Sequence, residues 1–199
     1  RCFGVASVAA WREQYARPIA AFRVSAKFSS STGAIAASLR QGERQAEKVV
    51  CEPFDEAGFR GALQTLRGMT RQTDPDVFTR ELTSVCAAHG VAVVFVPAPK
   101  GCPASGATRW LSPDKALLQL SLRHKTNDHL WFTVFHEAGH LVLHGKRMTF
   151  IEGTESISAE HEAEADRFAR DLLIPPSEAR ALRDVGRSHA RVQAFAERA

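Results

Sequence analysis

The stretch from Trp131 to His144, WFTVFHEAGHLVLH, constrains the fold of this chain more than any other segment. It is long enough for about four helical turns and is largely apolar, apart from three histidines and one glutamate. Such a segment is either a core helix with incidental histidines or a helix that carries a metal site. The spacing of its polar residues distinguishes the two interpretations.

That spacing favours the metal site. His136 and His140 lie about 40° apart around a helix and one turn apart along it, so both imidazoles can reach one ion. Glu137 is rotated by about 100° from His136 and can still act on a bound water as a general base. Gly139 leaves room for another chain segment to approach. The opposite side of the helix is apolar and should pack inward, leaving the histidines to face a cleft: Trp131, Val134, Phe135, Ala138, Leu141 and Val142.

The third histidine, His144, is not expected to be a ligand. On a continuous helix its Cα lies about 12 Å from that of His136, too far for one small ion to bind both. The extended pattern HExxHxxGxxH also fails, because residue 146 is lysine. We expect His144 to lie just outside the ligands or to close the helix before Gly145, where a histidine interacts favourably with the helix dipole.

The third ligand should come from residues 159–176, AEHEAEADRFARDLLIPP. The candidates are Glu160, His161, Glu162 and Glu164. On a helical projection the packed face is apolar and consists of Ala165, Phe168, Ala169, Leu172 and Leu173. Glu162 and Asp166 lie together on the margin of this face, whereas His161 precedes the packed turns. The other charged residues fall on the far side and should be solvated: Glu160, Glu164, Arg167 and Asp171.

We therefore predict Glu162 as the third metal ligand, with Asp166 orienting a ligating imidazole through its other nitrogen. Two histidines and one glutamate leave a position open for water, as in catalytic zinc sites. In such a site Zn²⁺ acidifies the water and polarises the scissile carbonyl, and Glu137 takes the proton. The sequence does not identify the group that stabilises the oxyanion. A structural or surface role is expected for the candidates, which are the only tyrosine and four basic residues near the junction between the third strand and the HExxH helix: Tyr15, Arg109, Arg123, His124 and His129.

Elsewhere the chain predicts an α+β fold that is mostly helical, with a small mixed or antiparallel three-stranded sheet beside the HExxH helix. Helices are predicted at residues 9–22 with a break at Pro18, 34–50, 59–68, 76–89, 126–144, 159–173 and 187–199. Strands are predicted at residues 91–96, 107–111 and 116–123, and a loop at 146–158. In the third strand apolar and polar residues alternate, which predicts that one side of the strand is polar. We expect this strand to lie at an edge of the sheet, where an extended substrate could pair with it.

Composition excludes several classes of protein. The net charge of +4 is spread along the chain, so a solvated surface explains it better than a nucleic-acid interface. The four cysteines form no CxxC pair, which argues against a disulfide framework and predicts a reducing, cytoplasmic setting: Cys2, Cys51, Cys86 and Cys102. No signal peptide or apolar run of about 18 residues is present, so no membrane association is expected.

The two motifs together resemble the IrrE/ImmA family of metallopeptidases. In that family the HExxH helix pairs with a helix of form E-x-[EQ]-A-[ND]-x-F-A-x-x-L-L-x-P. The first glutamate of this form maps onto Glu162 and its aspartate onto Asp166, in agreement with the projection. Residues 34–55, 85–97 and 106–132 are similar to members that carry an Xre-type helix-turn-helix before the peptidase domain. That domain is absent here, and the start at Arg1 in mid-element is consistent with a missing N-terminal part.

The resemblance implies a thermolysin-like zinc core in a bacterial or phage cytosol. It divides the chain into a helical N-terminal region, residues 1–75, and a zinc metallopeptidase-like domain, residues 76–199. It also implies a protein substrate, an Xre-type repressor whose cleavage releases genes of a damage response or mobile element. DNA would be bound only through the missing helix-turn-helix, and the oligomeric state is left open.

Two functions are consistent with these features. The first is a zinc-dependent endopeptidase of narrow specificity that cleaves a regulatory protein. The second is a transcriptional regulator or antitoxin-like protein whose peptidase-like domain senses a ligand or partner without proteolysis. Glu137 favours the first, because a domain that only binds has no need of the HExxH glutamate. A purely structural zinc site is disfavoured, because closed sites prefer cysteine-rich ligand sets.

Overall fold

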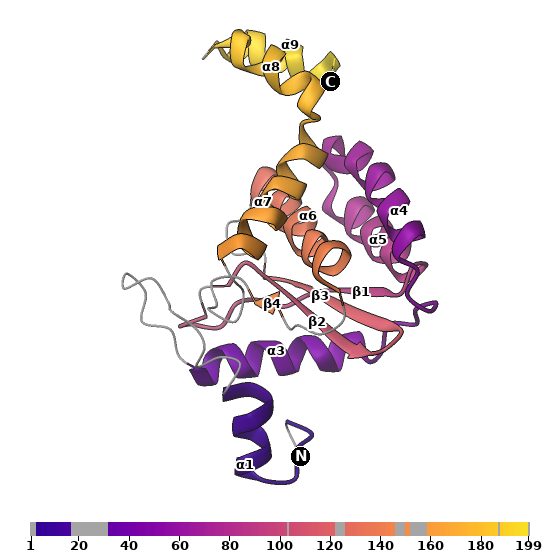
Figure 1. The fold of residues 1–199 in the computed structure, drawn as a ribbon, viewed down its shortest axis with the longest axis vertical. Coiled ribbons are helices and arrows are strands. Elements are labelled where there is room, and N and C mark those ends of the chain that lie inside the picture. Colours follow the sequence, from indigo (N-terminus) through magenta and orange to yellow (C-terminus); the bar gives the residue numbers. More distant parts are fainter. Residues whose placement is uncertain are drawn as a thin grey trace.

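The computed structural model describes residues 3–16, 32–102, 104–121, 126–145, 150–151, 159–186 and 188–198. Its α+β fold is mostly helical, as predicted (Figure 1). The helical elements are α1 (Val8–Trp11), the π-helical turn η1 (Arg12–Ala16), α3 (Thr32–Ala46), α4 (Glu56–Gly68), the 3₁₀ turn η2 (Met69–Arg71), α5 (Pro75–Ala87), α6 (Asn127–His144), α7 (Ala159–Leu173), α8 (Pro176–Val185) and α9 (His189–Arg198). The strands are β1 (Val91–Phe95), β2 (Gly106–Ser112), β3 (Lys115–Leu120) and β4 (Phe150–Ile151).

The strands form one mixed sheet in the order β1-β3-β2-β4. β1 runs parallel to β3, whereas β2 is antiparallel to both β3 and β4. The three predicted strands are confirmed over residues 91–95, 107–111 and 116–120 and make up most of this sheet. The last two residues predicted for the third strand, 122 and 123, lie outside the described residues. The short strand β4 lies inside the segment predicted as a loop, where two residues pair with Ala107 and Thr108 of β2.

The predicted role of β3 as a polar-sided edge is wrong. β3 lies between β1 and β2, so both of its backbone edges are already paired. Its polar residue Gln119 is buried and donates from Nε2 to Ser38 Oγ on α3 at 2.9 Å. The alternating residues of β3 therefore face two buried sides of the sheet. One side is apolar, and on the other side Gln119 has a polar partner on α3, so neither side is open to water.

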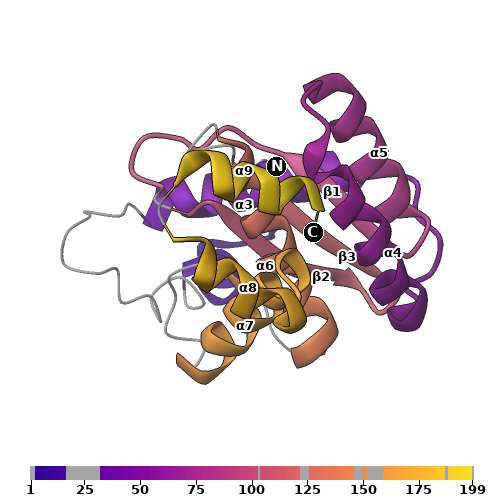
Figure 2. The ribbon, with the colours of Figure 1, turned by 90° about the horizontal axis from the view of Figure 1, so that it is seen from above.

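Helices cover both faces of the sheet (Figures 1 and 2). Val91 and Val93 of β1 pack into the main core with α4, α5, α6 and α7, whereas Ala92 and Val94 pack toward Ala46 of α3. This alternation follows from the two-residue period of a strand. The sheet is thus a central layer, with α6 on one side and α3 on the other.

A buried ionic cluster joins α3 to the N-terminal segment and to β2. Glu43 on α3 accepts hydrogen bonds from Tyr15 Oη at 2.7 Å, Arg40 Nη1 at 2.9 Å and Arg109 Nη1 at 2.5 Å. Burial, and then the hydrogen bond to Glu43, raise the pKa of Tyr15 to about 12, so its hydroxyl remains a donor. Tyr15 and Arg109 therefore have structural roles here, as expected.

Most helix ends follow the predicted signals. Gly90 and Gly145 have φ values of 81° and 72° and end α5 and α6, because glycine adopts the left-handed region without steric cost. The sequence does not predict α8, in which Pro176 occupies the first turn. The predicted N-terminal helix is seen as α1 and η1, and its part beyond residue 16 lies outside the described residues.

Two broader predictions concern the chain as a whole. The division at residues 75 and 76 stays a prediction, although α3 packs directly on the sheet. Among the described residues, no helix combines the length and apolar character needed to cross a membrane.

We expect Glu43→Gln to destabilise the fold by about 2–3 kcal/mol, because it removes the negative charge that neutralises two partly buried arginines. The matched control is Glu47→Gln. Glu47 is a second ion-pair partner of Arg40, and the Glu47 side chain is 59% exposed. That change should cost less than about 1 kcal/mol. Urea denaturation of both variants measures the difference, and equal losses would contradict the buried role of Glu43.

Candidate metal centre

The helix α6 is buried on almost every side. The predicted apolar residues all pack inward, as expected. The opposite side is covered as well: the exposed fractions are 5% for His136, 0% for Glu137 and 1% for His140. In this structure the two histidines are therefore enclosed by packed elements and have little contact with bulk solvent.

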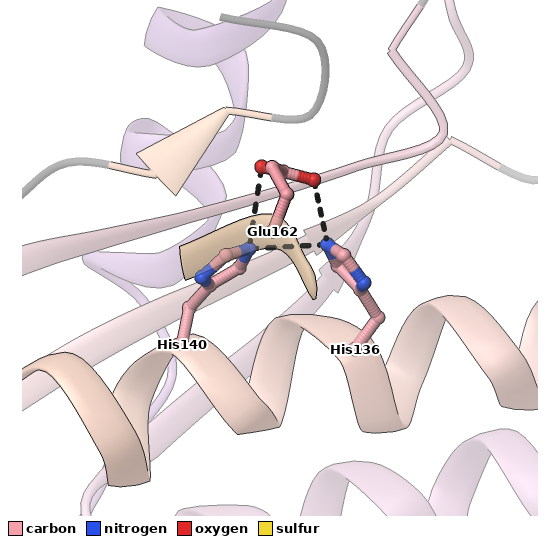
Figure 3. Close-up of side chains that lie close together, drawn as sticks. All are labelled: His136, His140 and Glu162. Carbon is pink, nitrogen blue, oxygen red and sulfur yellow. Dashed lines mark hydrogen bonds and ion pairs between the residues drawn. The ribbon is translucent and has the colours of Figure 1, made fainter. Parts of the chain in front are cut away.

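The cover on the histidine side is α7, which crosses α6 closely at Gly139. A Cβ atom at Gly139 would lie 3.1 Å from Phe168 Cδ1 and 3.3 Å from Ala165 Cα. Because Gly139 has no side chain, the two helix backbones can approach one another, as the sequence predicted. The crossing brings Glu162, in the first turn of α7, over the histidine pair (Figure 3).

His136, His140 and Glu162 form a compact triangle of ligand atoms. The Nε2 atoms of the histidines are 3.1 Å apart, and Glu162 places Oε2 3.4 Å from His136 Nε2 and Oε1 3.6 Å from His140 Nε2 (Figure 3). Ligands held at zinc's usual bond lengths with tetrahedral angles are separated by about 3.3 Å. The arrangement therefore fits one ion of that size. It is the one His/Cys/Asp/Glu group of this kind in the described part of the chain.

Asp166 contacts the ring nitrogen of His136 that points away from the triangle, as the helical projection predicts. Its Oδ1 lies 2.9 Å from His136 Nδ1. A proton on Nδ1 donates to this carboxylate and leaves the Nε2 lone pair directed at the triangle. Asp166 lies one turn beyond Glu162 on α7, so a single helix supplies both the proposed ligand and the group that orients a histidine.

The two histidines have opposite pKa shifts. Burial lowers the pKa of His136, but the hydrogen bond to Glu162 and the charges of Glu137, Glu162 and Asp166 outweigh it and raise the value to about 9. Burial, followed by the neighbouring charge of His136, lowers the pKa of His140 to about 3. Without a metal, the triangle at neutral pH thus holds one protonated and one neutral histidine.

Glu137 follows His136 on α6, its charge helps to raise the pKa of that histidine, and its carboxylate contacts β2. Thr108 donates from Oγ1 to Glu137 Oε2 at 2.5 Å, and both residues are fully buried. A Cβ atom at Gly106 would lie 2.5 Å from Glu137 Oε1. Sequence reasoning missed both Thr108 and Gly106. A glycine at the start of a strand was the available signal, because it often marks a close approach of other groups.

The other candidates lie outside the triangle. His144 Nε2 lies 3.3 Å from the backbone oxygen of His161, and its Nδ1 lies 3.6 Å from Glu164 Oε2. His144 thus ties the end of α6 to the first turns of α7. Glu160, Glu164 and Arg167 are exposed, as predicted. Arg123 and His124 lie outside the described residues.

Metal binding should depend on pH through His136. A raised pKa stabilises the metal-free fold below pH 6.5, and this contribution is lost as the pH rises through about 9. Zn²⁺ must displace that proton, so its apparent affinity should rise about tenfold per pH unit between pH 6.5 and 8. Competition with a chromophoric chelator measures this slope. A flat profile would show that His136 is already neutral.

Asp166→Ala should weaken Zn²⁺ binding by about 10- to 100-fold, because His136 loses the group that orients its ring. Glu164→Ala is the matched control. It also removes a carboxylate from α7, but this carboxylate contacts His144 and not His136. Glu164→Ala should change the Zn²⁺ affinity by less than about threefold. Isothermal titration calorimetry compares the two variants. Similar losses in both would indicate a general effect of negative charge and no specific role for Asp166.

Comparison with known proteins agrees with this geometry. No curated protein and no solved structure matches the chain significantly. A family match covers residues 86–199, more than half of the chain, and includes the strands β1, β2 and β3 as well as α6 and α7, which supply the triangle. The matched family is Peptidase_M78, described as the IrrE N-terminal-like domain. The chain belongs to this family of metallopeptidase-like domains.

Proposed function

We propose that the chain is a zinc-dependent endopeptidase that cleaves a regulatory protein. The observation that carries this proposal is the triangle of His136, His140 and Glu162, which fits one ion and includes a histidine whose pKa is raised in part by the charge of the buried Glu137. A set of two histidines and one glutamate is characteristic of catalytic zinc sites, which leave a position for water. Family membership supports a peptidase-like hydrolase at the family level.

The residues around the triangle have distinct tasks in this proposal. A bound divalent ion supplies Lewis acidity, which makes a water more acidic and polarises a carbonyl. Glu137 accepts the proton of the attacking water and passes it to the leaving amine. Asp166 keeps Nδ1 of His136 protonated and its Nε2 available. Burial of His136, Glu137 and His140 strengthens the electrostatic interactions among these three side chains, because the local dielectric constant is lower than that of water.

The proposed substrate is a transcriptional repressor of the Xre type. Its support is the similarity of residues 34–55, 85–97 and 106–132 to family members that carry an Xre-type domain of their own. Cleavage of such a repressor would place the chain in transcription regulation, as part of a stress response. A cytoplasmic setting fits this role, and no disulfide joins the cysteines of the described segments.

A second candidate function is sensing without proteolysis. The burial of His136, Glu137 and His140 favours it, because a polypeptide substrate needs direct access to the metal and the base. A regulator or antitoxin-like protein could instead use the centre to bind a metal ion, or respond to a partner at its surface. The two functions differ in one measurable property, which is turnover of a protein substrate.

The deciding experiment incubates the zinc-loaded protein with Xre-type repressors encoded beside its gene. Wild type should cleave one of them, as seen by intact-mass spectrometry. Glu137→Gln should lose at least about 10³-fold in rate while keeping the fold and bound zinc, because only the base is removed. Glu164→Gln, on the outer side of α7, serves as the active control. Absence of cleavage by the wild type would favour the sensing function.

A further inference from the structure

The hydroxyl of Thr108 reaches across from the sheet to the glutamate of the HExxH motif. Thr108 Oγ1 lies 2.5 Å from Glu137 Oε2 and 3.3 Å from the backbone oxygen of Glu137. The hydroxyl has a single proton, and the shorter distance and the negative charge direct it to the carboxylate. Both side chains are fully buried, so this bond lies in a region of low dielectric constant where it is strong.

The backbone of β2 closes in on the same carboxylate. A Cβ at Gly106 would lie 2.5 Å from Glu137 Oε1, 2.7 Å from its Cγ and 2.7 Å from Thr133 Cγ2. Only a glycine allows the start of the strand to approach so closely. The Glu137 side chain is therefore confined by packing at one oxygen and directed by a hydrogen bond at the other.

The strand that carries Thr108 is itself fixed. β2 pairs with β3 along most of its length and with β4 at Ala107 and Thr108. On the opposite face, the next residue, Arg109, donates to the buried Glu43 at 2.5 Å. The hydroxyl thus projects from an element that is held on both edges and on its rear face, as accurate placement of a functional group requires.

We propose that Thr108 is a positioning residue that sets the orientation of the Glu137 carboxylate toward the metal centre. This inference rests on the proposed function, because it assigns Thr108 a role in the same site. Thr108 acts only through Glu137 and touches no reacting atom. Removal of its hydroxyl should leave zinc binding intact and weaken only those interactions in which Glu137 takes part.

Acetohydroxamate provides a test that needs no substrate. A hydroxamic acid gives up a proton when it chelates a metal, and a carboxylate beside the metal strengthens binding by accepting that proton. The probe therefore reports how well Glu137 is placed. Binding to the zinc-loaded protein is measured by isothermal titration calorimetry, and zinc affinity separately by chelator competition.

Thr108→Val, which keeps the shape and removes the hydroxyl, should weaken acetohydroxamate binding by about tenfold. Its zinc affinity should stay within about threefold of wild type. Thr108→Ser, which retains the hydroxyl, should bind the probe within about threefold of wild type. Thr83→Val is the matched control, because its hydroxyl bonds to Thr79 O on α5, away from the site, and its loss should have no effect.

A double-mutant cycle separates positioning from packing. In a Glu137→Ala background, Thr108→Val should cause no further loss of probe binding, because the group on which it acts is already absent. An undiminished loss in that background would overturn the proposal, as would wild-type probe binding by Thr108→Val. Equal losses in Thr108→Val and Thr108→Ser would also overturn it, since they would indicate a packing role.

Cleavage assays on the same variants keep the two proposals apart. If the wild type cleaves a repressor, Thr108→Val should lower kcat by about tenfold with little change in KM, and Thr108→Ser should restore it. If the wild type cleaves nothing while the hydroxamate pattern holds, the peptidase function fails and the positioning of Glu137 by Thr108 stands.

Discussion

The crossing of α7 over α6 at Gly139 is the contact on which the candidate metal centre depends. The His136–His140 pair is a property of one helix, but the third corner of the triangle comes from another. The side-chain-free surface at Gly139 lets Ala165 and Phe168 pack against α6, and this contact brings Glu162 and Asp166 to the histidines. A Cβ at residue 139 would require Phe168 or Ala165 to shift by a few tenths of an ångström, and a larger side chain would require the two helices to separate.

The electrostatics of the centre follow from that packing. Glu137, Glu162 and Asp166 place negative charge around a buried histidine pair, and the field raises the pKa of one histidine while burial lowers that of the other. Glu137 is fully buried, whereas the side chains of Glu162 and Asp166 are 30% and 58% exposed. Their negative charges repel one another unless a cation compensates. A divalent ion would supply that compensation, so the same residues that would perform the chemistry also favour the metal.

The strand β2 connects the two sides of the molecule. Its front face carries Thr108, which bonds to Glu137, and its rear face carries Arg109, which bonds to Glu43 together with Tyr15 of the N-terminal segment. Neighbouring residues on a strand point to opposite faces, so one strand can serve both clusters. The position of Thr108 beside the centre is thereby linked to the packing of α3 and the N-terminal segment behind the sheet.

The sequence by itself determined most of the helices and strands and the residues that could hold a metal ion. Helical spacing identified His136 and His140, the projection of α7 selected Glu162 and Asp166, and Gly145 marked the end of α6. These features depend on local periodicity. Only the tertiary structure decided that β3 is interior, that α7 covers the histidines, and that Thr108 and Gly106 enclose Glu137. Those outcomes depend on which faces meet across long sequence separations, and alternation or capping signals do not specify the partner of a face.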